Sequence, residues 1–313
     1  MRSAGGAPVI VGVDGSLEAL RAVRLAAEEA ARRRRPLRVL HALGWPLHQT
    51  PVRPQASGPL DGGPRFQAER ILAQAIAEAR QAAPDIPVNG EIADGQPATV
   101  LVNRSPYATL IVLGHRGLGG FASLLLGSVA VQVSAHAQCP VLIARGVDRP
   151  AAPVAVGVDG SRLSELAIGF AVEEAAWRGR ELIALHAYQL PDGDATDLPP
   201  STSEADQPHD GQERILTEAT APWRSRYPDL RIVHRPVRGR PASALVEESN
   251  HAGLVVVGAR GRGGFAGLVT GSVSHAVLHH AACPVAVVRR GPEIPPEGAD
   301  RPPVPGQSPA PGS

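Results

Sequence analysis

The sequence contains no lysine, so all 31 of its basic residues are arginine. This absence excludes the phosphate-binding loop of the Gly-Lys-Ser/Thr type. It also excludes a Schiff-base lysine and the strand lysine of a protein kinase. If the chain binds a nucleotide, backbone amides and hydroxyl groups must therefore hold the phosphates, with a metal ion or an arginine as a further aid.

Aromatic residues make up only 3% of the chain, whereas the apolar fraction of 43% is ordinary for a globular protein. The core must therefore be built from Val, Leu, Ile and Ala. Cysteine occurs only at Cys139 and Cys283, which is too few for a disulfide framework or a cysteine-based metal site. Each precedes a proline and an apolar run, and we interpret both as small buried hydrophobic residues.

The net charge of +1 provides no bulk attraction for nucleic acid or for an anionic membrane. No apolar run approaches the roughly 20 residues that a membrane-spanning helix needs, and the first residues lack the apolar core of a signal peptide. We therefore expect a cytoplasmic protein without a nucleic-acid or membrane partner. Arg32 to Arg35 form a basic run, which we interpret as the solvated end of a helix that complements the helix dipole.

The chain repeats itself along most of its length. The segment Gly-Val-Asp-Gly-Ser at 12–16 returns at 157–161, a shift of 145 positions. A period of this length indicates two duplicated domains rather than a solenoid. We place the first domain at residues 1–148 and the second at 149–290, and we expect the proline-rich residues 291–313 to be a disordered tail.

A glycine motif, Gly-x-x-Gly followed by nine residues and Gly-Ser, occurs at 114–128 and again at 258–272. From 114–145 to 258–289, 18 of 32 positions are identical. Each motif follows an apolar run typical of a buried parallel strand, and its Gly-Ser begins a helical segment whose free N–H groups favour phosphate. Tight turns alone are the alternative, but both copies keep the glycines and the serine, which favours a binding loop.

Apolar runs alternate with helical segments and predict five strands in each half. In the first half we expect strands at 8–13, 37–43, 86–92, 110–113 and 141–144, with helices at 17–33 and 66–82 and another opening at 95–98. Long proline- and glycine-rich loops are expected at 44–64 and 190–210, before helices at 66–82 and 212–226. This alternation predicts an α/β fold with a parallel sheet covered on both faces, whose ligands bind at the carboxyl ends of the strands.

Taken together, these motifs resemble the universal stress protein family in its tandem two-domain form, over about residues 8–290. The resemblance implies two open five-stranded, Rossmann-like parallel sheets in the order 3-2-1-4-5, whose domains often pair through their last strands. Family members with this glycine motif bind ATP, so two sites for ATP with Mg²⁺ are implied. The implied role is a regulatory nucleotide sensor in the stress response, with slow or absent hydrolysis and no catalytic residue.

The resemblance also implies the contacts of each ATP. Asp14 and Gly114 would face the ribose, and the backbone near Ala42 would meet the adenine edge. Four further residues would hold the phosphates: Gly117, Gly127, Ser128 and Val129. The matching set in the second domain is Asp159, Ala187, Gly258, Gly261, Gly271, Ser272 and Val273.

The chain departs from the family pattern in several places. Thr109 and Gly253 stand where many members carry aspartate, which we expect to affect a turn rather than the ligand. His115 becomes Ala259 in the second half, so no shared catalytic role is assigned to it. Leu118 becomes Arg262, which is interpreted as a solvated arginine, with a phosphate contact as the alternative.

Other functions remain open at this stage. One is a weak ATPase or a nucleotidyl- or phosphoryl-transfer enzyme, with Asp14 or Asp159 as a general base. Another is a partner-binding scaffold that has lost its nucleotide. His275 and His279 stand four residues apart on a helix, as a metal pair would, but the first half does not repeat them, and no metal site is predicted. A homodimer of two chains is possible.

Overall fold

The computed structural model describes residues 6–44, 63–118, 125–189, 207–261 and 271–289. The loops predicted at 44–64 and 190–210 lie largely outside these ranges, as do Arg262 and the tail at 291–313. The first half consists of β1 (Val9–Val13), α1 (Leu17–Arg32), β2 (Leu37–Leu43), α2 (Pro64–Ala82), β3 (Val88–Asp94), α3 (Pro97–Arg104), a 3-10 turn (Ser105–Tyr107), β4 (Leu110–Gly114), α4 (Ser128–His136) and β5 (Val141–Ala144).

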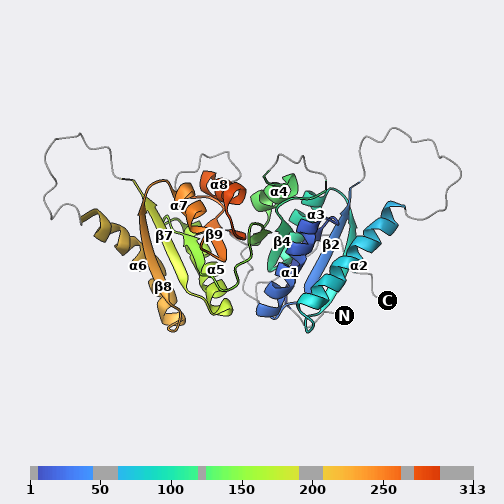
Figure 1. The fold of residues 1–313 in the computed structure, drawn as a ribbon, viewed down its shortest axis with the longest axis horizontal. Coiled ribbons are helices and arrows are strands. Elements are labelled where there is room, and N and C mark those ends of the chain that lie inside the picture. Colours follow the sequence, from blue (N-terminus) through green and yellow to red (C-terminus); the bar gives the residue numbers. More distant parts are fainter. Residues whose placement is uncertain (1–5, 45–62, 119–124, 190–206, 262–270, 290–313) are drawn as a thin grey trace, which may run out of the picture.

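The second half repeats this order of helices and strands. It consists of β6 (Val154–Gly157), α5 (Arg162–Arg178), β7 (Leu182–Tyr188), α6 (Gln207–Arg226), β8 (Ile232–Arg238), α7 (Pro241–Glu248), β9 (Leu254–Gly258), α8 (Ser272–His280) and β10 (Val285–Val288). The two halves lie side by side in Figure 1, the first at the right in blue to green and the second at the left in yellow to red.

All ten strands belong to one continuous sheet in the order β3-β2-β1-β4-β5-β10-β9-β6-β7-β8. Within each half the pairs are parallel and the order is 3-2-1-4-5, which confirms the predicted topology. The halves meet where β5 pairs with β10 in antiparallel fashion, with Leu142 opposite Ala286. The last strands therefore join the two predicted sheets into one, along a joint whose side chains are fully buried.

Helices cover both faces of the sheet, and each face has a core that continues across both halves. One core lies under α1, α2, α5 and α6, and the other lies under α3, α4, α7 and α8. The central strands are almost wholly apolar, because a parallel sheet covered on both faces leaves no polar side to its strands. Valine, leucine, isoleucine and alanine dominate both cores, as the scarcity of aromatic residues requires.

The element boundaries differ from the predicted ones in a few places. Helix α2 begins at Pro64 rather than at 66, and α6 begins at Gln207, inside the range predicted as a loop. Both starts contain a proline in the first turn, where its missing N–H group costs no helical hydrogen bond. Strand β3 begins two residues later than predicted, at Val88.

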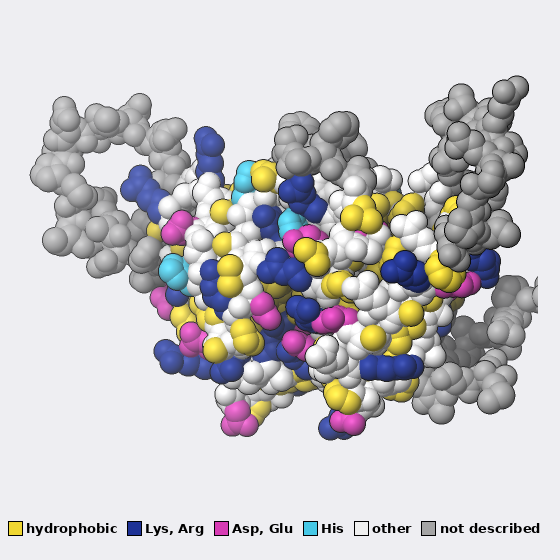
Figure 2. Space-filling model, turned by 45° about the vertical axis from the view of Figure 1, so that its right-hand side comes forward, with side chains coloured by type: hydrophobic (Ala, Val, Ile, Leu, Met, Phe, Trp, Pro, Cys, Tyr) yellow, Lys and Arg dark blue, Asp and Glu magenta, His cyan; other side chains and the backbone are white. Residues whose placement is uncertain are grey.

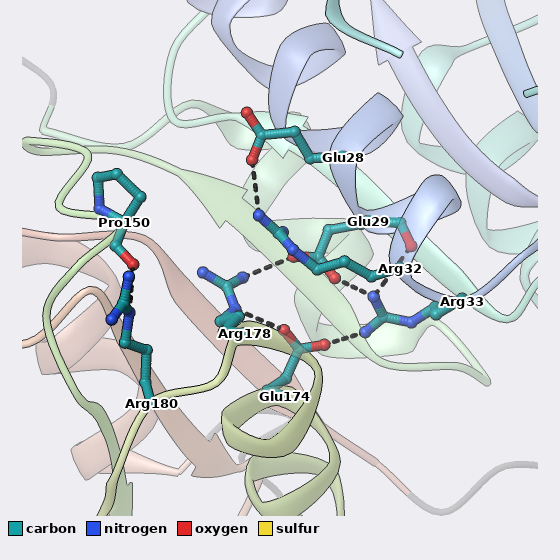
Figure 3. Close-up of polar contacts among 8 residues, drawn as sticks. All are labelled: Glu28, Glu29, Arg32, Arg33, Pro150, Glu174, Arg178 and Arg180. Carbon is teal, nitrogen blue, oxygen red and sulfur yellow. Dashed lines mark hydrogen bonds and ion pairs between the residues drawn. The ribbon is translucent and has the colours of Figure 1, made fainter. Parts of the chain in front are cut away.

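The interpretation of the run Arg32 to Arg35 as solvated is wrong for Arg33. Its side chain is only 4% exposed and bonds the carboxylates of Glu29 from α1 and Glu174 from α5. Arg178, which is 8% exposed, likewise contacts Glu29 at 2.5 Å and Glu174 at 2.9 Å. We call Glu29, Arg33, Glu174 and Arg178 the boundary ring; Figure 3 shows its four side chains meeting between α1 and α5.

The boundary ring consists of a Glu–Arg pair from the first half and the equivalent pair from the second half, which contact each other. Glu29 of α1 and Arg33, which caps the end of that helix, stand four residues apart, and Glu174 and Arg178 of α5 repeat them. Each glutamate is buried and contacts arginines from both halves, so every charge in the ring has partners of opposite sign. Arg33 also lies over the rings of Phe170 and Trp177. Because the charges are buried, we expect the ring to fix how the halves fit together.

Figure 2 shows one face of the molecule, on which arginine side chains and acidic side chains are interspersed. This mixture agrees with the small net charge of the chain. Among the described residues, no helix combines the length and apolar character needed to cross a membrane.

Candidate functional site

One pocket in each half lies at the carboxyl ends of the strands. The first pocket has a volume of about 520 Å³, and its counterpart in the second half is smaller. Strands β1, β2 and β4 and the start of α4 line it. All seven residues that the resemblance assigned to the first domain lie there together: Asp14, Ala42, Gly114, Gly117, Gly127, Ser128 and Val129.

Asp14 connects the loop after β1 with the glycine loop after β4. Its Oδ1 accepts a hydrogen bond from the backbone N–H of Ser16 at 3.0 Å, and its Oδ2 accepts one from the N–H of Leu118 at 2.7 Å. The Ser16 hydroxyl in turn caps α1 by accepting from the N–H of Ala19 at 3.1 Å. Asp14 therefore holds the two loops of the pocket together, a role that sequence analysis did not assign.

His41 and its counterpart His186 support the same loops from the second strand of each half. The Nδ1 atom of His41 lies 2.8 Å from the carbonyl oxygen of Val13, and that of His186 lies 2.6 Å from the oxygen of Val158. A carbonyl oxygen only accepts, so each Nδ1 carries the proton of this hydrogen bond. Both histidines are half-buried, and each is held by a backbone hydrogen bond to the end of the first strand of its half.

Helix α4 begins at the pocket without a side-chain cap. Its N-cap residue is Gly127, whose own N–H donates to the carbonyl oxygen of His115 at 2.8 Å. A Cβ atom at Gly127 would lie 3.5 Å from that oxygen, an ordinary contact, so alanine would fit the protein while filling space in the pocket. A Cβ atom at Gly117 would instead overlap the Asp14 carboxylate. Gly117 therefore permits the contact of Asp14 with the glycine loop.

The second pocket repeats this construction in about 370 Å³. The seven residues that the resemblance assigned to the second domain all line it: Asp159, Ala187, Gly258, Gly261, Gly271, Ser272 and Val273. Asp159 accepts from the N–H of Ser161 at 2.9 Å, and Gly271 donates to Ala259 at 2.8 Å. Helix α8 likewise begins here without a side-chain cap.

Two hydroxyl groups distinguish the second pocket from the first. Ser164 and Ser274 line it, whereas Ala19 and Ala130 stand at the corresponding places of the first pocket. The Ser164 hydroxyl accepts from the N–H of Asp159 at 3.2 Å, and the Ser274 hydroxyl lies 3.1 Å from the carbonyl oxygen of Ala259. The second pocket therefore presents two hydroxyl groups where the first presents methyl groups, although the assigned residues are equivalent.

An arginine lines each pocket at the second position after the first glycine of the motif. These residues are Arg116 in the first pocket and Arg260 in the second. Both arginines occupy a variable position of the Gly-x-x-Gly motif, and no role was predicted for either. Their repetition in both halves was the available signal, because a guanidinium group beside uncapped helix N–H groups adds positive charge to an anion site.

His115 lies beside the glycine loop but does not line the first pocket. Its Nδ1 atom is 3.3 Å from the Glu18 carboxylate and 3.3 Å from the carbonyl oxygen of Ala144. Burial lowers the pKa of His115, and this effect outweighs the opposite influence of Glu18. Thr109 and Gly253 lie at the other ends of β4 and β9, away from the pockets, where their N–H groups donate to the carbonyl oxygens of Pro8 and Pro153.

Metal and cysteine chemistry find little support in the described ranges. No group of three or more His, Cys, Asp or Glu residues within them is arranged to hold a metal ion. The rings of His275 and His279 lie 4.3 Å apart, centroid to centroid, without a third ligand there. Cys139 and Cys283 are free and buried, as interpreted, and burial raises the pKa of each to about 12.

Comparison with known proteins identifies the class of this chain. The model of the universal stress protein family matches residues 7–145 and again 152–289, and the chain belongs to this family. A universal stress protein of Mycobacterium tuberculosis strain H37Rv is 40% identical over 292 residues, which cover 90% of this chain and 97% of that protein. A crystal structure of a universal stress protein from Archaeoglobus fulgidus shares the fold, with a TM-score of 0.65 and 21% identity over 91% of this chain and 97% of that one.

Another curated relative, a universal stress protein of Mycolicibacterium smegmatis, is 36% identical over 291 residues. These residues cover 90% of this chain and 96% of that protein. The family match thus extends over both halves and over nearly the full length of the relatives.

Proposed function

We propose that the protein binds one ATP molecule with Mg²⁺ in each half and acts as a regulatory nucleotide sensor in the stress response. The observation that carries this proposal is that a pocket occurs at the equivalent place in each half. In both pockets the lining includes the seven assigned residues, which stand at matching positions of the repeat. Both pockets lie where the strand order reverses between β1 and β4 or between β6 and β9. This switch point is where open α/β sheets bind their ligands.

The groups that line the first pocket suit a nucleotide triphosphate. The uncapped N–H groups of Ser128 and Val129 offer hydrogen bonds to phosphate oxygens, and Arg116 adds a positive charge. The backbone near Ala42 would meet the adenine edge, while Asp14 and Gly114 would face the ribose. Both Asp14 oxygens already accept backbone hydrogen bonds, so Mg²⁺ would be held chiefly by the phosphates and water.

These groups favour binding over catalysis. In the described part of each pocket, the lining includes a single carboxylate, Asp14 or Asp159. A general base needs a lone pair directed at the proton it removes. The carboxylate of Asp14 instead directs both oxygens at backbone N–H groups of its own loops. We therefore expect hydrolysis of ATP to be slow or absent.

Calorimetric titration of Mg²⁺–ATP into the purified chain tests this proposal. We expect two molecules bound per chain, and none in the double variant Gly127→Ala plus Gly271→Ala, because each methyl group would fill space beside an uncapped helix. Circular dichroism of the double variant checks that the fold is intact. A phosphate-release assay on the parent chain measures hydrolysis in the same samples.

Two outcomes would contradict the proposal. If ATP gives no heat and no nucleotide is released when the protein is denatured, the pockets do not hold nucleotide and a partner-binding scaffold is favoured. If phosphate release is rapid and is lost on changing Asp14 or Asp159 to asparagine, the protein is an ATPase rather than a sensor.

A further inference from the structure

Arg145 is a residue of the first half that contacts a helix of the second. It follows directly on β5, and its guanidinium group reaches the carboxyl end of α8. Its Nη1 donates to the carbonyl oxygens of Val277, at 3.3 Å, and Leu278, and its Nη2 donates to that of His279 at 3.0 Å. One guanidinium group thus serves three consecutive carbonyl groups.

These carbonyl groups are among those that a helix leaves without an internal partner. The last four C=O groups of an α-helix lack an N–H partner within the helix, and they form the negative end of its dipole. Helix α8 ends at His280, and the N–H of Ala281 already donates to the carbonyl oxygen of Val277 at 2.9 Å. Arg145 therefore shares the Val277 carbonyl with Ala281 and adds a donor for those of Leu278 and His279. Partial burial lowers the pKa of Arg145, yet a guanidinium group retains its proton in proteins, so the helix end meets a half-buried positive charge.

The opposite end of the same helix forms the second pocket. Gly271, Ser272 and Val273 line that pocket, and α8 has only nine residues, about 13 Å of helix. A short helix held at its carboxyl end has little freedom to shift or tilt at its amino end. The position of the N–H groups in the second pocket therefore depends on a side chain from the first half.

We infer that Arg145 is a positioning residue for the phosphates bound in the second pocket. It holds α8 so that its uncapped N–H groups face the ligand. This inference rests on the proposed nucleotide function. Arg145 also adjoins Ala144, whose carbonyl oxygen accepts from the N–H of His115 in the first glycine loop at 3.1 Å. The residue that holds α8 thus directly follows, in the sequence, a residue that bonds the glycine loop of the first pocket.

The variant Arg145→Gln tests the inference, with each pocket measured alone. In a Gly127→Ala background only the second pocket binds, and in a Gly271→Ala background only the first one does. We expect Arg145→Gln to weaken ATP binding about two- to fivefold in the second pocket, the range for one charge at a helix end. Binding in the first pocket should change much less, because the guanidinium group of Arg145 bonds the end of α8, which belongs to the second pocket.

Adenosine provides a readout that a general loss of structure would not reproduce. It lacks phosphates, so Arg145→Gln should leave its affinity for the second pocket unchanged while ATP affinity falls. Arg145→Lys, which keeps the charge, should recover part of the ATP affinity. The matched control is Arg149→Gln, because Arg149 donates to the carbonyl oxygen of Ala282, beyond the end of α8, at 3.3 Å.

The outcomes separate this inference from the proposed function. Equal loss of ATP and adenosine affinity, or the same loss with Arg149→Gln, would overturn the positioning role, as would unchanged ATP binding by Arg145→Gln. Absence of ATP binding in both single-pocket backgrounds and in the parent chain would instead overturn the nucleotide function itself.

Discussion

The pockets and the boundary ring are built from duplicated residues, but the copies relate to one another in opposite ways. In the pockets, each copy serves its own half: Asp14 binds the loops of the first half, and Asp159 binds the loop of the second. In the ring, each copy contacts the other half: Arg33 bonds Glu174, and Arg178 bonds Glu29. The same duplication thus yields two separate pockets and one boundary ring shared by both halves.

This difference determines how far a substitution should reach. A change in one pocket removes contacts within one half and leaves the other half intact. A change in the ring removes a partner from arginines of both halves, since every ring carboxylate contacts both Arg33 and Arg178. Side chains in the ring are buried, so water cannot replace the missing charge.

The largest effect is expected from Glu174→Gln in the boundary ring. The amide removes a negative charge beside two buried guanidinium groups, which costs about 3–5 kcal/mol when a buried ion pair loses one partner. Urea unfolding followed by circular dichroism measures the loss. Because one sheet runs through both halves, we expect a single transition that moves as a whole.

Two comparisons sharpen the test of the ring. Glu29→Gln should cost at least as much as Glu174→Gln, because Glu29 contacts Arg33 and Arg178 as Glu174 does and contacts Arg32 as well. Glu28→Gln, whose side chain is 40% exposed and contacts Arg32, should cost less than about 1 kcal/mol. A loss below about 1 kcal/mol for Glu174→Gln would mean that the ring does not hold the halves together.

The residues of each pocket and the pairing of the last strands could be expected from the sequence, whereas the boundary ring could not, for a physical reason. The residues of a pocket follow strand ends within one repeat, and parallel strand ends meet at one edge of the sheet. Asp14 and Gly117 could therefore be placed together before the structure was known. The sheet order followed from the resemblance of the motifs to a known family, not from the spacing of the apolar runs.

The ring was missed because its partners are distant in the sequence. Arg33 and Glu174 are 141 positions apart, and a basic run at a helix end is ordinarily solvated. The available signal was the repeat itself: a glutamate followed four residues later by an arginine occurs at the ends of both α1 and α5. When both copies of a helix carry the same charged pair on an otherwise apolar face, a contact between the two copies is indicated.

A smaller effect, confined to one half, is expected from Asp14→Asn. An amide offers one accepting oxygen where the carboxylate offers two, so the link to Ser16 or to Leu118 is lost. A hydrogen bond to a charged group contributes about 1.5–3 kcal/mol, and we expect ATP binding in the first pocket to weaken at least tenfold. Calorimetry in the Gly271→Ala background measures the first pocket alone.

Asp159→Asn is the matched variant for the second pocket, measured in the Gly127→Ala background. Each substitution should leave the other pocket unchanged. If Asp14→Asn also weakened the second pocket to a similar extent, the pockets would not be separate, and the contrast with the boundary ring would fail.

The smallest effect concerns pH and compares His115 with its titration-free counterpart Ala259. Burial lowers the pKa of His115 below its ordinary value of 6.5, so the unfolded chain binds this proton more readily than the folded one. Folding stability contributed by neutral His115 is therefore complete above pH 6.5 and is lost as the pH falls towards the lowered pKa. His115→Ala should remove this contribution and make the decline of stability with acid shallower.

Urea midpoints of the parent and His115→Ala between about pH 5 and 8 measure the difference. Some slope will remain in the variant, because burial also lowers the pKa of His234 and His279. The midpoint-against-pH curves of the two chains should run parallel above pH 6.5 and approach each other below it. Protonation at position 115 lowers the stability of the parent chain alone, whereas that of His234 and His279 affects both chains. Curves that stay parallel throughout would show that the first glycine loop responds to acid no more than the second, and that the two pockets are alike in this respect.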